Sequence, residues 1–228
     1  MRFCEMFSPN FNVGRNGCLP DMIVLHTTGN TTQSAINTVM NSNNSVSYHF
    51  LIAENGDITQ LVDIFDTAWH SGITNFVRSS EVFKNKAHFR VQDRTNSPND
   101  YTIGIGFGDM NLNRWVLTDE QVLSARVLIR YIRDEVKRRL GYRISLTREY
   151  IIGHSDINPL NRANCPGDIQ WGEIMDGLDD EVAYWAVEGV QWVQRNGVSD
   201  GLRPNEFVTR QEVMQMFFNY DQKRKIAE

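Results

Sequence analysis

Hydrophobic positions follow two spacings over the first three quarters of the chain. Short runs of branched apolar residues predict buried strands. These runs lie at residues 22–26, 48–53, 58–64, 102–107 and 151–152. Asn55-Gly56, between the second and third runs, is typical of a tight hairpin turn.

Helical spacing is clearest after Thr118, which forms a capping box with Gln121, and Gly141 ends this helix. A second capped helix is expected from residue 30 to about residue 40. Strands and helices mix without strict alternation. We therefore predict an α/β domain over residues 1–175, with a mixed central β-sheet flanked by helices.

The pattern changes after residue 176, and no strand is evident beyond it. Helical spacing from Val182 to Val193 predicts one helix, which Asn196-Gly197 ends. A capping box of Thr209 and Glu212 opens another. Residues 178–228 are expected to form a small all-α helix–loop–helix unit, too short to be reliably stable alone.

Composition narrows the class of protein. The chain has 228 residues and a formal net charge of −5, which gives no electrostatic support for a nucleic-acid partner. The three cysteines, an odd number, argue against a disulfide framework. No apolar run approaches the roughly 20 residues that span a membrane, so no membrane partner is expected. The first six residues lack the pattern of a secretion signal, and synthesis in the cytoplasm is expected.

Two histidines and one cysteine lie at or soon after predicted strand ends. His26 ends the strand at 22–26, His154 follows the strand at 151–152, and Cys165 lies in the loop beyond. Two imidazoles and a thiolate suit zinc and leave a fourth position for water. Taken alone, each residue of these types is more often a surface or packing residue than a ligand. The residues by themselves indicate an α/β domain with a candidate metal site.

A resemblance to a known family rests on several motifs in order. They are Val24–Gly29, Ser47–Ile52 with Asn55-Gly56, Ala68–Gly72, Ile103–Gly108, Gly153–Asp156 and Cys165–Gly167. Together they resemble the type-2 N-acetylmuramoyl-L-alanine amidases, which include phage endolysins and the peptidoglycan recognition proteins. The resemblance implies hydrolysis of the amide bond between N-acetylmuramic acid and L-alanine in peptidoglycan. It also implies a Zn²⁺ cofactor held by His26, His154 and Cys165.

The same resemblance implies roles for neighbouring residues. Tyr48 stands where some branches carry a tyrosine close to the metal, so it is the candidate to orient water or the developing oxyanion. Its alternative role is packing within a strand. Trp69 and His70 lie in the motif that binds the glycan–peptide and are the candidate substrate contacts.

The sequence departs from the family's pattern at two positions. Gly106 occupies the place of a catalytic glutamate found in some branches, and Ala163 replaces a Lys or Thr found in many active members. A methyl group cannot donate a hydrogen bond. Either the adjacent Arg162 supplies positive charge, or Tyr48 contributes more, or activity is low.

Four other features are less specific. His49 is expected to pack on the opposite side of the sheet from Tyr48. His88 is expected at the solvated surface, and Asp156 either orients a ligand or caps a loop. The polar segment Ile73–Tyr101 contains no predicted element and resembles a binding loop or lid.

The C-terminal unit resembles a single surface-layer-homology motif. The matching residues are Tyr184–Ala186, Gly197-Val198, Asp200-Gly201, Pro204 and Thr209–Glu212. Such motifs imply attachment to a secondary cell-wall polymer. The alternative is a helical pair that docks on the amidase domain.

Three functions follow from these observations. The leading hypothesis is a phage or prophage endolysin that reaches the wall when the membrane is breached. The second is a module that binds peptidoglycan without cutting it, a hypothesis that Ala163 favours. The third is an amidase of soluble muropeptides in wall recycling. Cleavage of insoluble sacculi, as opposed to soluble fragments, would separate the first hypothesis from the third.

Overall fold

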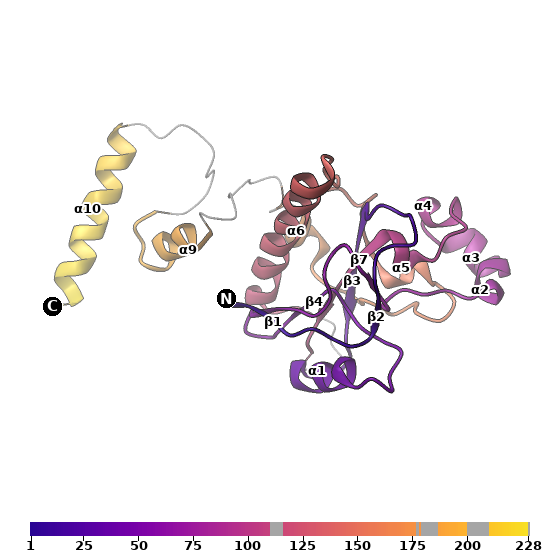
Figure 1. Cartoon of the computed structure of the whole chain (residues 1–228). Coiled ribbons are helices and arrows are strands. Elements are labelled where there is room, and N and C mark those ends of the chain that lie inside the picture. The colour runs from indigo at the N-terminus through magenta and orange to yellow at the C-terminus, as the bar shows by residue number, and fades with distance from the viewer. Residues whose placement is uncertain (110–115, 177, 179–186, 200–209, 228) are drawn as a thin grey trace. The chain divides into compact units, whose positions relative to one another are not determined.

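The computed structural model describes residues 1–109, 116–176, 178, 187–199 and 210–227 (Figure 1). The chain divides into two units, Met1–Met175 and Asp176–Glu228. All of the described strands lie in the first unit.

A mixed sheet forms the centre of the first unit. Its strands, in spatial order, are β1 (Phe3–Glu5), β5 (Ile58–Gln60), β4 (Phe50–Ile52), β7 (Thr102–Phe107), β3 (Met22–Thr27) and β8 (Ile151–Gly153). β4 and β5 run antiparallel, whereas the other neighbours run parallel. Gly56, with φ of 80°, lies in the β4–β5 connection and confirms the predicted hairpin. β4 and β5 are shorter than the apolar runs that predicted them. β2 (Phe11–Asn12) and β6 (Thr67–Ala68) form a separate antiparallel pair.

One long helix, α6 (Asp119–Leu140), packs against the sheet. Thr118 and Gln121 form the predicted capping box, and Gly141 ends the helix with φ of 81°. The Ser124 hydroxyl donates to the Gly56 carbonyl at 2.6 Å, which ties the helix to the hairpin. The helix buries a row of apolar side chains at helical spacing: Val122, Ala125, Ile129, Ile132 and Val136.

Shorter helices pack elsewhere on the sheet. α1 (Thr32–Met40) places Ala35 and Val39 against Leu51 of β4. Four helices follow between β6 and β7: α2 (Asn75–Ser79), α3 (Glu81–Lys86), α4 (Phe89–Gln92) and α5 (Pro98–Tyr101). Their buried side chains form one core cluster with Met22 and Val24 of β3.

The sequence predicted no regular element between residues 73 and 101. The structure has the four helices α2 to α5 there, so this expectation was wrong. Each of the four helices has only four to six residues. Helices this short span fewer than two turns, and their apolar residues cannot show a helical period. The rest of the fold confirms the predicted class, a mixed sheet flanked by helices.

The second unit contains two described helices, α9 (Val187–Arg195) and α10 (Arg210–Ala227). The Trp192 and Tyr220 rings lie 5.6 Å apart, and the Asn219 amide donates to the Val198 carbonyl at 3.2 Å, so the two helices contact each other. Most of the surface-layer-homology-like motif, including Tyr184–Ala186, Asp200-Gly201, Pro204 and Thr209, lies outside the described residues. Within the described ranges, no helix is long and apolar enough to cross a bilayer.

Candidate metal centre

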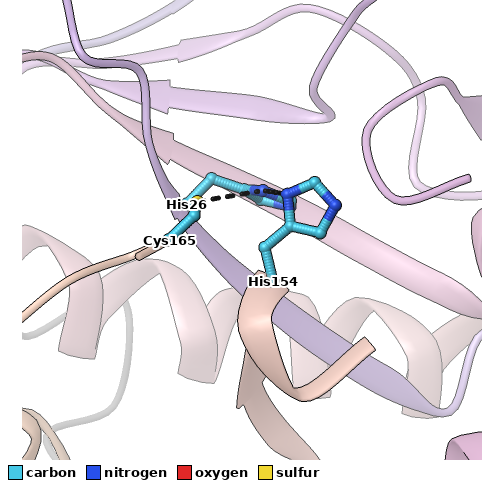
Figure 2. Close-up of side chains that lie close together, drawn as sticks. All are labelled: His26, His154 and Cys165. Carbon is cyan, nitrogen blue, oxygen red and sulfur yellow. Dashed lines mark hydrogen bonds between the residues drawn. The ribbon is translucent and has the colours of Figure 1, made fainter. Parts of the chain in front are cut away.

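His26, His154 and Cys165 converge at the ends of two neighbouring parallel strands. His26 lies near the end of β3, and His154 follows β8, the next strand in the sheet, as the first residue of α7 (His154–Ile157). The two Nδ1 atoms lie 3.1 Å apart, and Cys165 Sγ lies 3.9 Å from His26 Nδ1 (Figure 2). One nitrogen or sulfur atom from each residue falls within 4.8 Å of the other two. The structure thus brings together the three residues that the sequence predicted as ligands.

The loop that carries Cys165 is tied to α7 and β8. The Ser155 N–H donates to the Cys165 carbonyl at 2.7 Å, and the Cys165 N–H donates to the Arg162 carbonyl at 3.0 Å. A Cβ added at Gly153 would lie 2.6 Å from Pro166 Cδ. Gly153 therefore lets the Cys165-Pro166 segment lie close to the strand end from which His154 follows.

The donor set fits a zinc ion. Two nitrogens and a sulfur bound tetrahedrally to one zinc at about 2.0–2.3 Å would lie roughly 3.3–3.6 Å from one another. The two nitrogens lie 3.1 Å apart, Cys165 Sγ lies 3.9 Å from His26 Nδ1, and all three donor atoms lie within 4.8 Å of one another. Small side-chain adjustments would complete the site.

Protonation also favours metal binding. Burial, followed by the charge of His154, keeps the pKa of His26 well below its usual range. Burial, and then Arg162, lowers the pKa of His154 to about 4. Both imidazoles are neutral at neutral pH, as metal ligands must be. Burial raises the pKa of the Cys165 thiol, and a bound cation would reverse that effect.

A pocket of about 540 Å³ opens over the three candidate ligands, and Tyr48 and Arg162 are among its lining residues. The Tyr48 ring lies 5.3 Å from the His26 ring. Burial raises the pKa of the Tyr48 hydroxyl, so this group stays protonated and can donate a hydrogen bond. Trp69, a predicted substrate contact, is half-buried and is not among the described residues that line this pocket.

Gly106, at the position where the sequence resemblance implies a glutamate in some branches, lies against Tyr48. Gly106 of β7 pairs with His26 of β3, and a Cβ at Gly106 would lie 3.2 Å from the Tyr48 ring. The Tyr48 ring occupies the space above Gly106. A side chain at position 106 would therefore crowd the Tyr48 ring, which would have to move by a few tenths of an ångström.

His70 lies beside His26 and is only 6% exposed, although it also borders the pocket. Its Nδ1 lies 3.0 Å from His26 Nε2. Burial, then the charges of His154 and Arg15, lower the pKa of His70 to about 3. The sequence predicted His70 as a substrate contact and gave no indication of its contact with His26.

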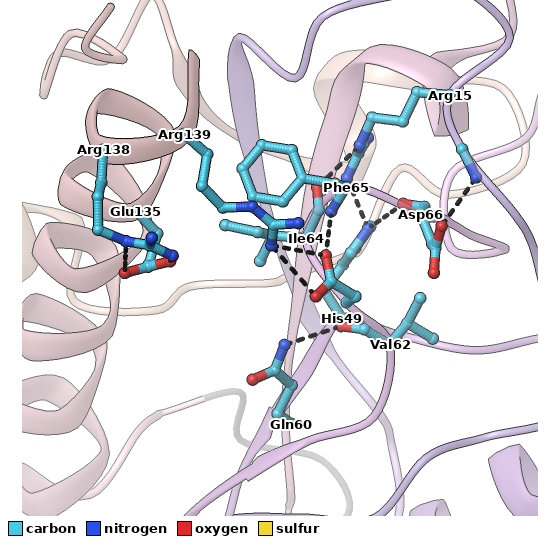
Figure 3. Close-up of polar contacts among 12 residues, drawn as sticks. Arg15, His49, Gln60, Val62, Ile64, Phe65, Asp66, Glu135, Arg138 and Arg139 are labelled. Carbon is cyan, nitrogen blue, oxygen red and sulfur yellow. Dashed lines mark hydrogen bonds and ion pairs between the residues drawn. The ribbon is translucent and has the colours of Figure 1, made fainter. Parts of the chain in front are cut away.

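A buried arginine behind the site was also missed. Arg15 is 5% exposed, and its guanidinium donates to the Ile64 carbonyl at 2.9 Å (Figure 3). It also donates to the Thr102 carbonyl at 2.9 Å. It lies 2.7 Å from Nε2 of His49, whose Nδ1 accepts a hydrogen bond from the Gly104 N–H at 2.9 Å. His49 is fully buried, and besides packing it satisfies a backbone donor of β7.

The structure also decides two of the less specific expectations. His88 is half-buried, not at the solvated surface, because its N–H donates to the Asp156 carbonyl and it precedes α4, which packs on the core. Asp156 caps α7, since its carboxylate accepts from the Gly153 N–H at 2.8 Å.

The fold and the ligand cluster define a mixed α/β domain with a His–His–Cys site at the carboxyl ends of parallel strands. Residues 16–168 match the family described as N-acetylmuramoyl-L-alanine amidase, and the chain belongs to that family. The chain is 34% identical over 133 residues to the 1,6-anhydro-N-acetylmuramyl-L-alanine amidase AmpD of Haemophilus influenzae. That match covers 58% of this chain and 59% of the relative, so the chain spans less than two thirds of the relative's length.

Solved structures share the fold. The structure of a selenomethionine derivative of AmpD aligns with a TM-score of 0.53 at 19% identity, over 77% of this chain and 93% of that one. The structure of a mutant of PlyL aligns with a TM-score of 0.52 at 14% identity, over 79% of this chain and 100% of that one. At these identities the likeness establishes the fold alone.

Proposed function

We propose that this chain is a zinc-dependent N-acetylmuramoyl-L-alanine amidase that hydrolyses the amide bond between N-acetylmuramic acid and L-alanine in peptidoglycan. The observation that supports the proposal is the convergence of His26, His154 and Cys165 within 4.8 Å beneath a pocket, in a chain of the amidase family. A bound zinc ion would supply Lewis-acid polarisation of the scissile carbonyl and a water of lowered pKa.

The chain's own residues supply the remaining chemistry. The protonated Tyr48 hydroxyl is the candidate donor to the oxygen that gains negative charge in the transition state. Arg162, exposed at the pocket, carries a guanidinium that can stabilise negative charge but is not suited to shuttling a proton. Trp69 and His70 remain the predicted substrate contacts.

Two substrates are consistent with this site. Action on the insoluble wall, as a phage or prophage endolysin, is the first candidate and would use the C-terminal unit to bind a wall polymer. The relative from Haemophilus influenzae is named for a 1,6-anhydro-N-acetylmuramyl substrate, and this similarity favours soluble muropeptides as the second candidate. Co-sedimentation with sacculi that is unchanged after removal of residues 178–228 would argue against wall attachment.

The deciding experiment measures the release of peptide amino termini from Gram-positive sacculi and, separately, from soluble anhydro-muropeptides. We expect wild-type protein to cut at least one substrate, and both a zinc chelator and Cys165→Ala to abolish the cleavage. Cys4→Ala, at an exposed cysteine outside the site, is the matched control and should retain activity. Folded, zinc-loaded protein that cuts neither substrate would refute the amidase proposal and favour a module that only binds peptidoglycan.

A further inference from the structure

The two ring nitrogens of His26 face different partners. Nδ1 points toward His154 Nδ1 and Cys165 Sγ, at 3.1 and 3.9 Å. Nε2 points toward Nδ1 of His70 at 3.0 Å, and the two rings meet at 90°. A neutral imidazole carries one hydrogen and one lone pair. Only the tautomer with its hydrogen on Nε2 leaves Nδ1 free to bind a metal.

The hydrogen-bond chain beyond His70 selects that tautomer. Thr102 Oγ1 lies 2.6 Å from the Pro98 carbonyl, which can only accept, so the threonine hydrogen is donated there. Thr102 Oγ1 must then accept from His70 Nε2, 3.3 Å away. A neutral His70 with its hydrogen on Nε2 has a lone pair on Nδ1, which accepts from His26 Nε2. Because the Pro98 carbonyl can only accept, it sets which atom donates in each of these three hydrogen bonds.

The position of His70 is fixed by neighbouring elements. A Cβ at Gly104 of β7 would lie 2.5 Å from the His70 ring, so the ring rests directly on the glycine backbone. The N–H groups of His70 and Ser71 both donate to Asn99 Oδ1, at 3.1 and 2.7 Å. Gly104 and Asn99 together hold the imidazole against His26.

We infer that His70 is a positioning residue of the metal site: it accepts the Nε2 hydrogen of His26 and so holds that ligand in its metal-binding tautomer and orientation. This inference rests on the proposed zinc function and gives His70 a role other than substrate contact. Hydrogen-bond partners of metal-bound histidines affect metal affinity by about 10- to 100-fold.

The first test is a matched pair of substitutions, His70→Asn and His70→Leu. The Asn Oδ1 atom can stand near the position of His70 Nδ1 and accept the same hydrogen, whereas Leu of similar size cannot. Zinc affinity, measured by competition with a chromophoric chelator, should fall about 10- to 100-fold in His70→Leu and largely recover in His70→Asn. The visible spectrum of the cobalt-substituted protein should change in the Leu variant and resemble wild type in the Asn variant.

A second test displaces the His70 ring by a substitution at another residue, Gly104. Gly104→Ala places a methyl group against the His70 ring and should weaken zinc binding about as much as His70→Leu does. Gly106→Ala, two residues along the same strand, contacts Tyr48 instead and should leave zinc affinity close to wild type. Thermal unfolding of the metal-free proteins separates these effects from misfolding.

The outcomes distinguish failure of the positioning role of His70 from failure of the proposed zinc-dependent function. Wild-type protein that fails to bind zinc would overturn both. Wild type that binds zinc, with His70→Leu within about threefold of it, would overturn the inference alone. If hydrolysis then fell while zinc affinity held, His70 would instead be the substrate contact that the sequence predicted.

Discussion

The floor and the rim of the metal pocket differ in how the fold holds them. We define the floor as His26, Tyr48, His70 and His154, and the rim as residues 161–164. The floor histidines are between 1% and 8% exposed and lie on or against the strands β3, β7 and β8. The rim residues are exposed and belong to a loop. Its backbone is tied at Asn158, whose carbonyl accepts from the Arg162 N–H at 2.8 Å.

The floor contributes buried hydrogen bonds that fix the positions of side chains, whereas the rim contributes an exposed charge. Buried hydrogen bonds are costly to break because the partner left behind is not resolvated, about 1–3 kcal/mol each. Exposed charges contribute about 1 kcal/mol or less and are screened by salt. We therefore expect substitutions in the floor to have large, salt-independent effects, and substitutions in the rim to have small, salt-dependent ones.

The largest effect among the floor variants that retain the metal is expected for Tyr48→Phe. The substitution keeps the ring that rests on Gly106 and removes only the hydroxyl. Loss of one donor to a developing oxyanion lowers kcat by about 100- to 1,000-fold. Zinc affinity should not change, and the loss should be the same at low and high salt. A decrease of less than about threefold would show that Tyr48 is a packing residue.

Much of the fold that carries the floor could be predicted because local patterns encode it. Apolar runs identified the strands that carry or precede the ligands, and the capping box and Gly141 fixed the limits of α6. Their positions at or soon after strand ends made His26, His154 and Cys165 candidate ligands, and the resemblance to a family then implied that all three bind zinc. Hydrophobic spacing alone could not distinguish them from packing residues.

The role of His70 could not be predicted because it depends on strand pairing. His70 reaches His26 only because Gly104, which pairs with Val24, provides a place without a side chain. The alternation Ile103-Gly104-Ile105-Gly106 was the available signal, since it gives one face of β7 bulk and the other none. Arg15 left no local signal, because its carbonyl partners at Ile64 and Thr102 are distant in sequence.

A smaller effect, on stability, is expected at His49 beneath the floor. Burial, followed by the charge of Arg15, keeps the pKa of His49 well below its usual range. Below about pH 6.5 the unfolded chain binds a proton at this histidine and the folded chain does not. The free energy of unfolding therefore decreases as the pH is lowered, by up to about 1.4 kcal/mol per pH unit. His49→Asn can still accept from the Gly104 N–H and removes this titration.

Urea unfolding of metal-free protein at pH 7 and pH 5 measures the effect. Between these values wild type should lose about 2 kcal/mol more stability than His49→Asn loses. Comparing each protein with itself removes any cost of the substitution at neutral pH. Equal losses in the two proteins would mean that His49 is protonated in the folded state and that the region beneath the floor admits water.

The smallest effect is expected at the rim. Arg162→Gln should lower kcat/KM by about two- to fivefold at low ionic strength, and the difference should shrink in high salt because the guanidinium is exposed. Arg162→Lys should keep most of the activity. Adding Ala163→Lys to Arg162→Gln should restore the charge from the position where the sequence resemblance implies a Lys or Thr, whereas the same change in wild type should add little. A loss of 100-fold or more at Arg162→Gln, unchanged by salt, would mean that the guanidinium closes over the bound substrate and acts as part of the floor.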